Sequence, residues 1–420
     1  MKFTFFKKLA IVMIVGAGYL FTGCSNDTFT EETTTSQTSK TVLKTVGKNS
    51  SFIEELQQRK NQFIYFKNKL DGGDTSTQEF ETFVKNEATP KFINETAFKL
   101  VKKAVLMAID PDVYACGETP ELDAYLSAST ADWTFIDVLY YYFLSYHPTY
   151  DAYLLADPND RGIFGPNGEY TNELQRNFKS LKRFWDINSG NIGMVPMTGR
   201  VYRDIERLIT IERILYPSQT EEENRYFAEL VNEIFGQDQF WNHTHPLLSF
   251  NAVAISLDGE IAGYYVGDRI AMGDGIMMAY EAIGLGDTGP SAILAHEFGH
   301  HIQYDNGYFN EVTPENEPEE TRRTELMADA FSAYYLTHKR GATMNWWKVN
   351  QFMNVFYNIG DCSFTSPGHH GTHAQRMAAA QWGYNVANNH QKKGKIMGAH
   401  EFYLLFEAEY DGIINCTDCL

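Results

Sequence analysis

Two histidines and a glutamate in one short segment have the residue types and the spacing of a metal site. The segment AHEFGH begins at Ala295 and places His296 and His300 four residues apart. In a helix, residues at i and i+4 share one face, so both imidazoles can bind one metal ion and Glu297 can reach a water molecule bound to it. The pattern predicts a zinc-dependent hydrolase; the alternative is a pair of surface histidines on an amphipathic helix.

The residues around this motif predict a largely buried helix. Thr288 is a candidate N-cap, Pro290 stands in the first turn, and Asn306-Gly307 is a stop signal. The apolar run at 292–295 leads directly into His296. Buried polar side chains without partners are costly, and a metal ion supplies those partners.

A catalytic zinc ion usually has three protein ligands and one open position. The extension of the motif by a glycine and a third histidine fails here, because Gln303 and Asn306 stand at those positions. A second helix, expected over about 319–338, offers Glu325 instead.

Asp329 lies four residues after Glu325, so both acids are expected on one side of the second helix. Asp329 can accept a hydrogen bond from the non-ligating nitrogen of His296 or His300 and fix its tautomer. The alternative is a solvated pair of acids. The apolar neighbours of Asp329 favour the buried role, because unpaired acids are seldom buried.

Three segments occur in a recognisable order: AHEFGHHIQ at 295–303, ELMAD at 325–329 and HGTHAQR at 370–376. Together they resemble the bacterial neutral zinc metallopeptidases of the gluzincin type, over roughly residues 250 to 385. The resemblance implies that His296, His300 and Glu325 bind zinc, that Glu297 is the general base, and that the third segment contributes near the active site. It also implies a zincin-like α+β fold, mainly helical, with a small mixed or antiparallel sheet packed against the zinc-binding helices.

Peptide hydrolysis in such a site needs a second electrophile to stabilise the oxyanion. Thr372 and Gln375 form a capping-box pattern, which predicts that a helix begins at Thr372 and leaves His370 on the loop before it. We therefore favour His370 as the second catalytic residue. The other candidates are His369 and His373, with Tyr334 and Tyr335 behind them.

The N-terminus has the pattern of an export signal. Three lysines precede a short apolar core at 9–21, and Cys24 follows it in a way that resembles a bacterial lipoprotein signal. A plain secretory signal with an incidental cysteine is the alternative. We expect an exported protein, lipid-anchored at Cys24 to the outer membrane of a Gram-negative bacterium, on its periplasmic face or at the cell surface.

Charge and cysteine content agree with export. The net charge is −19 and becomes −22 without residues 1–23, which carry three lysines and no acid. Such a surface argues against nucleic acid as a partner. The substrate partner is expected to be a peptide or protein. Four cysteines remain if Cys24 is lipidated, and disulfides are possible among them: Cys116, Cys362, Cys416 and Cys419.

The chain divides into five expected regions: a signal peptide (1–23), a flexible tether (24–50), a helical N-terminal region (51–170), the metallopeptidase domain (171–395) and a C-terminal extension (396–420). Strands are expected at 250–255, 261–266 and 269–278. Within the last of these, residues 272–275 are a candidate site for pairing with a substrate backbone.

Two classes of function remain open from the sequence. The first is a zinc metallopeptidase that hydrolyses peptide bonds with Glu297 as general base. The second is a non-catalytic or import-associated surface lipoprotein that retains a zincin-like fold. The intact Glu297 favours the first.

Overall fold

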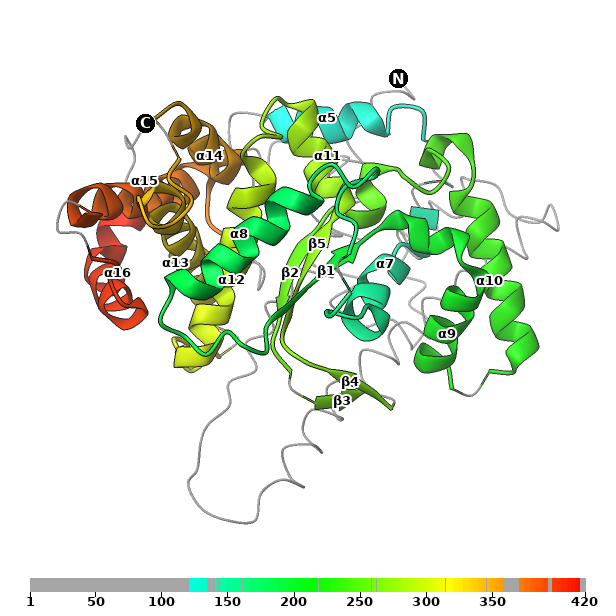
Figure 1. The fold of residues 1–420 in the computed structure, drawn as a ribbon. Coiled ribbons are helices and arrows are strands. Elements are labelled where there is room, and N and C mark those ends of the chain that lie inside the picture. Colours follow the sequence, from blue (N-terminus) through cyan, green and yellow to red (C-terminus); the bar gives the residue numbers. More distant parts are fainter. Residues whose placement is uncertain are drawn as a thin grey trace, which may run out of the picture.

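The computed structural model shows a mainly helical protein with a small sheet, which is the α+β class that the sequence predicts (Figure 1). The residues that the structure describes are 121–133, 137, 140–141, 144–160, 162–217, 219–257, 259–261, 263–313, 315–344, 346–358, 370–391 and 395–415. Within these ranges, no helix has both the length and the apolar composition that crossing a membrane requires.

Several expectations fall on residues outside the described ranges. They are the signal peptide, the tether, the first part of the helical N-terminal region, and one oxyanion candidate, His369. The cysteines also lie there: Cys24, Cys116, Cys362, Cys416 and Cys419.

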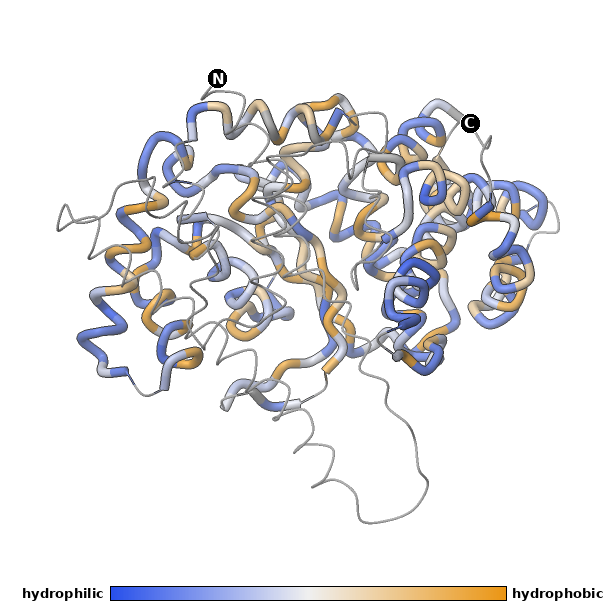
Figure 2. The backbone as a smooth tube through the Cα atoms, turned by 180° about the vertical axis from the view of Figure 1, so that it is seen from behind, coloured by the Kyte–Doolittle hydropathy of each residue, from blue (hydrophilic) through white to orange (hydrophobic). Residues whose placement is uncertain are grey.

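A three-stranded mixed sheet lies at the centre of the molecule. It consists of β1 (Gly193–Met197), β5 (Arg269–Gly273) and β2 (Ala252–Ile255), in that order. The middle strand, β5, runs parallel to β1 and antiparallel to β2. All five residues of β5 are buried, and the central strands carry mostly hydrophobic colours in Figure 2. A separate hairpin is formed by β3 (Gly259–Ile261) and β4 (Tyr264–Val266).

The strand expected at 269–278 is only half correct. β5 ends at Gly273, and α11 (Asp274–Ala282) begins at the next residue. The Asp274 carboxylate accepts hydrogen bonds from the Gly165 backbone N–H and from Arg200, which tie the start of this helix to a distant loop. A short apolar run does not separate strand from helix by its periodicity. Residues 272–275 are also wrong as a site for substrate pairing, because β5 has a neighbouring strand on both sides.

Helices lie on both sides of the sheet (Figure 1). One group comprises α7 (His147–Tyr150), α9 (Ile205–Leu215) and α10 (Glu221–Phe235). The other comprises α8 (Thr171–Phe184), α12 (Gly289–Asn306), α13 (Glu317–Thr337), α14 (Trp346–Asn358), α15 (His373–His390) and α16 (Ala399–Ile414). The first described helix, α5 (Glu121–Ser129), lies near α11 and α14. The helices that the sequence predicts around the histidine motif, at about 319–338 and from Thr372 are present as α12, α13 and α15.

The helix that carries the two histidines begins and ends where its sequence indicates. Pro290 stands in the first turn of α12, and Gly307 ends the helix in the left-handed conformation with φ 66°. Every residue from Gly289 to Gln303 is buried. The prediction of a buried helix is confirmed.

Two glycines allow three helices to pack backbone against backbone. A Cβ atom at Gly299 of α12 would lie 3.0 Å from the Ala328 Cα of α13, and a Cβ at Gly383 of α15 would overlap the Ala330 backbone oxygen. Because neither glycine has a side chain, α13 lies directly between α12 and α15. This arrangement brings residues of all three helices to one place.

Candidate metal centre

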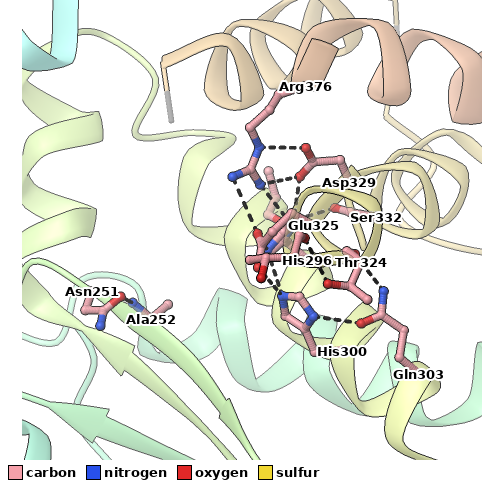
Figure 3. Close-up of polar contacts among 12 residues, drawn as sticks. Asn251, Ala252, His296, His300, Gln303, Thr324, Glu325, Asp329, Ser332 and Arg376 are labelled. Atoms are coloured by element: carbon pink, nitrogen blue, oxygen red, sulfur yellow. Dashed lines mark hydrogen bonds and ion pairs between the residues drawn. The ribbon is translucent and has the colours of Figure 1, made fainter. Parts of the chain in front are cut away.

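Three side chains from two helices converge in the buried interior. His296 and His300 of α12 and Glu325 of α13 each offer one ligand atom, and these atoms lie within 4.8 Å of one another (Figure 3). The two imidazole Nε2 atoms are 3.1 Å apart, and the Glu325 oxygens lie 3.2 Å from one and 3.4 Å from the other. This buried group could hold a metal ion.

Asp329 contacts the first histidine as its position in the sequence suggests. Its Oδ1 atom lies 2.8 Å from His296 Nδ1, and the side chain is fully buried. Because a carboxylate accepts hydrogen bonds, His296 Nδ1 carries the proton and Nε2 presents a lone pair in the neutral ring.

The second histidine is oriented by Gln303, which stands where the extended motif would have a glycine and for which no role was predicted. The Gln303 amide nitrogen donates to the Thr324 carbonyl oxygen at 2.7 Å, so its Oε1 atom is the one that lies 2.9 Å from His300 Nδ1. His300 Nδ1 is therefore a donor, and its Nε2 also presents a lone pair. The i, i+3 spacing of His300 and Gln303 is the sequence feature from which this contact could have been predicted.

The arrangement of the donor atoms favours a positive charge between them. Two imidazole lone pairs face each other across 3.1 Å, beside a carboxylate, and all three side chains are buried. Without a positive charge this arrangement is repulsive and desolvated. A proton meets the same demand: burial alone would lower the pKa of His296, but hydrogen bonds to Asp329 and Glu325 outweigh burial and raise that pKa to about 10.

Glu325 is held in its ionised form. Burial alone would raise its pKa, but the nearby His300 and His370 imidazoles and the hydrogen bonds from the two histidines lower the pKa well below its usual value. An ionised carboxylate can serve as a metal ligand without first losing a proton.

Glu297 is buried next to the donor group. Burial raises the pKa of its carboxyl group above the usual value, and the His296 and His300 imidazoles partly offset that rise. Its carboxylate accepts a hydrogen bond from the backbone N–H of Ala254 on β2. Glu297 therefore lies between the donor group and the outer edge of β2.

His370 lies close enough to Glu325 to lower its pKa, as the analysis of the third segment predicts for a residue near the site. It is half-buried and precedes α15, whose N-terminus has the expected capping box between Thr372 and Gln375. His373 is buried in the first turn of that helix.

The two tyrosine candidates do not belong to the site. The Tyr334 hydroxyl accepts a hydrogen bond from the Met397 backbone N–H, and the Tyr335 hydroxyl donates to the Asn177 carbonyl oxygen. Both rings pack against Phe184 in the hydrophobic core. Their expected role as reserve oxyanion donors is wrong, because both hydroxyls have these partners in the packed core.

A buried arginine joins the site from a third helix. Arg376 of α15 donates two hydrogen bonds of 2.7 Å to Asp329 and faces Glu325 Oε2 at 3.5 Å (Figure 3). Arg376 belongs to the third segment of the sequence, but no role was predicted for it. Only the order of the three segments could have indicated that Arg376 lies at the site. The contact between α13 and α15 itself depends on the glycine packing described above.

Comparison with known proteins adds no assignment. No protein-family model, no curated protein and no solved structure matches the chain.

Proposed function

We propose that the protein is a zinc-dependent metallopeptidase with a zincin-like arrangement of its two ligand helices. The observation that carries the proposal is the buried group of His296, His300 and Glu325 beside the carboxylate of Glu297. A structural metal site needs no such neighbour, whereas hydrolysis needs a base within reach of a water molecule. A zinc ion bound here would polarise a carbonyl group and lower the pKa of a water molecule.

Glu297 is the general base of this proposal. Its carboxylate takes a proton from the attacking water and passes it to the leaving nitrogen. The raised pKa of Glu297, caused by burial, brings its proton affinity closer to neutral pH, where a group can both accept and release a proton. His370 stabilises the negative charge on the carbonyl oxygen in the transition state.

The substrate backbone is proposed to pair with the outer edge of β2. No other described strand pairs with that edge. The Ala252 N–H donates to Asn251 Oδ1, and the Ala254 N–H donates to Glu297. An extended peptide added along β2 would therefore pass the general base. The buried Asn251 Nδ2 atom has no hydrogen-bond partner among the described residues, and in this proposal it donates to a peptide carbonyl.

The proposal includes the export pathway expected from the N-terminus. In it, the protein is a lipoprotein anchored through Cys24 outside the inner membrane, and its substrates are peptides or proteins in that compartment. Membrane fractionation of the wild-type protein and of Cys24→Ser tests the anchor, because the variant should leave the membrane fraction or fail to mature.

The decisive experiment is a peptide-library cleavage assay on purified protein, combined with metal analysis. We expect one zinc ion per chain, cleavage of peptide bonds, and loss of both after treatment with a chelator. Zinc binding without cleavage of any peptide would instead support the second class, a binding or import-associated lipoprotein.

A further inference from the structure

Arg376 connects two carboxylates of the metal centre although it belongs to a helix that contributes no ligand. It is 2% exposed. Its Nε and Nη2 atoms donate to the two oxygens of Asp329, and its Nη1 atom lies 3.5 Å from Glu325 Oε2. A guanidinium that bonds both oxygens of a carboxylate fixes the plane of that carboxylate as well as its position.

The orientation of Asp329 determines the orientation of His296. Asp329 Oδ1 accepts hydrogen bonds from Arg376 Nη2 and from His296 Nδ1, at 2.7 Å and 2.8 Å. Any rotation of the carboxylate would break one of these bonds. Because the imidazole ring is rigid, holding Nδ1 at Asp329 also holds Nε2 toward His300 and Glu325.

We propose that Arg376 is a positioning residue for the metal centre. It fixes the His296 ring through Asp329 and holds the Glu325 carboxylate through Oε2, so that the donor group is formed before a metal ion arrives. The inference rests on the metal centre of the proposed function but not on its reaction or its substrate.

The competing explanation is that Arg376 only ties α15 to α13. The chain contains a matched control for that role in Arg323, another buried arginine with two hydrogen bonds to one carboxylate, that of Glu320. Arg323 also pairs with Glu407 on α16, so it too joins α13 to a neighbouring helix. No contact of Arg323 with a metal-binding side chain is found in the described structure.

The test compares Arg376→Met with Arg323→Met in two measurements that need no activity. Zinc dissociation constants are measured by competition with a chromophoric chelator, and the visible absorption spectrum is recorded after loading with Co²⁺. We expect about 10- to 100-fold weaker zinc binding and a changed Co²⁺ spectrum for Arg376→Met, which is the usual effect of losing support behind a ligand. Arg323→Met should lose thermal stability but keep both the affinity and the spectrum. Equal effects in both variants, or less than a twofold change for Arg376→Met, would overturn the proposal.

A second comparison covers the case in which Arg376→Met does not fold. Arg376→Lys keeps the charge but cannot bond both carboxylate oxygens, so it should bind zinc more weakly than wild type while remaining soluble. The double variant Arg376→Lys/Asp329→Asn should lose less zinc affinity than the two single losses add up to, because Arg376 acts on His296 through Asp329. Fully additive losses in the double variant would contradict that route. Failure of wild-type, zinc-loaded protein to cleave peptides would remove the peptidase proposal and leave these outcomes unaffected.

Discussion

Gln303 accepts a hydrogen bond from His300 Nδ1 across one turn of α12, and its amide nitrogen bonds the Thr324 carbonyl oxygen on α13. One side chain therefore fixes the tautomer of His300, a candidate metal ligand, and also connects the two helices that carry the candidate ligands. Asp329 has the corresponding role for His296, so each histidine has its own acceptor.

The first prediction concerns this amide. Gln303→Leu should weaken zinc binding by about 10-fold or more, because His300 Nδ1 loses its acceptor and the ring is free to turn. Gln303→Glu keeps an acceptor for His300 and should retain more affinity than the leucine variant, although it loses the donor to Thr324. Zinc competition titrations of both variants check this order. Equal affinity in Gln303→Leu and wild type would show that His300 is held by other contacts.

The second prediction separates the base from the ligands. Glu297→Gln should keep one zinc ion per chain and lose peptidase activity by more than about tenfold, because an amide cannot take the proton from water. Glu325→Ala should instead lose most of its zinc, because it removes one of three donors. Metal analysis and cleavage rates on the same samples distinguish the two effects. A fully active Glu297→Gln variant would assign the base to another residue.

The third prediction concerns the oxyanion. His370→Ala should lower turnover by roughly 100-fold, with little change in zinc content or Michaelis constant, since the interaction forms mainly in the transition state. His373→Ala is the comparison, because His373 lies in the capped first turn of α15. Steady-state kinetics of the two variants provide the measurement. Near-normal turnover in His370→Ala would place the oxyanion partner elsewhere.

The fourth prediction concerns acid stability, away from the metal centre. Burial lowers the pKa of His245 to about 4, and the ring stays neutral while bonding the Ser129 carbonyl oxygen and the Leu247 N–H. In the unfolded chain the pKa is about 6.5, so the unfolded state binds more protons between these values. His245 therefore makes its full contribution to the free energy of unfolding above pH 6.5. As the pH drops toward 4, the loss of this contribution lowers the free energy of unfolding by about 3 kcal/mol.

His245→Asn keeps an acceptor for the Leu247 N–H and removes the titrating ring. Denaturant unfolding of the metal-free protein between pH 7 and 4.5 should show a shallower loss of stability for this variant than for wild type. Parallel curves for the two proteins would mean that His245 is protonated in the folded state without cost.

The sequence predicted the ligand group because the chemistry of each helix is local. The spacing of His296, His300 and Glu297 is fixed within one helix, and that of Glu325 and Asp329 within another. Contacts between helices could not be predicted in this way. The role of Arg376 depends on α15 approaching α13 at Gly383, and no spacing within one segment encodes that approach.

The order of the strands in the sheet could not be predicted from the sequence either. Residues 252–255 and the start of β5 were expected as strands, but their order was not. The choice between 272–275 and β2 as the substrate-pairing strand depends on which strand lies in the middle, and that depends on β1, whose parallel partner is 76 positions further along the chain (Gly193 with Arg269). Long-range pairing of this kind leaves no local signal.

The contact between Gly299 and Ala328 has a consequence for how a metal ion would be captured. With two backbones touching there, the spacing of the ligand helices is set by main-chain atoms and cannot be adjusted by rotating side chains. The protein should therefore take up a metal without folding around it, and circular dichroism spectra of the metal-free and metal-loaded forms should superimpose. In Gly299→Ala, the new Cβ would lie 3.0 Å from the Ala328 Cα, so the helices would have to shift by a few tenths of an ångström. The relative affinity of this variant for metal ions of different radius would show how strictly the backbone sets the size of the site.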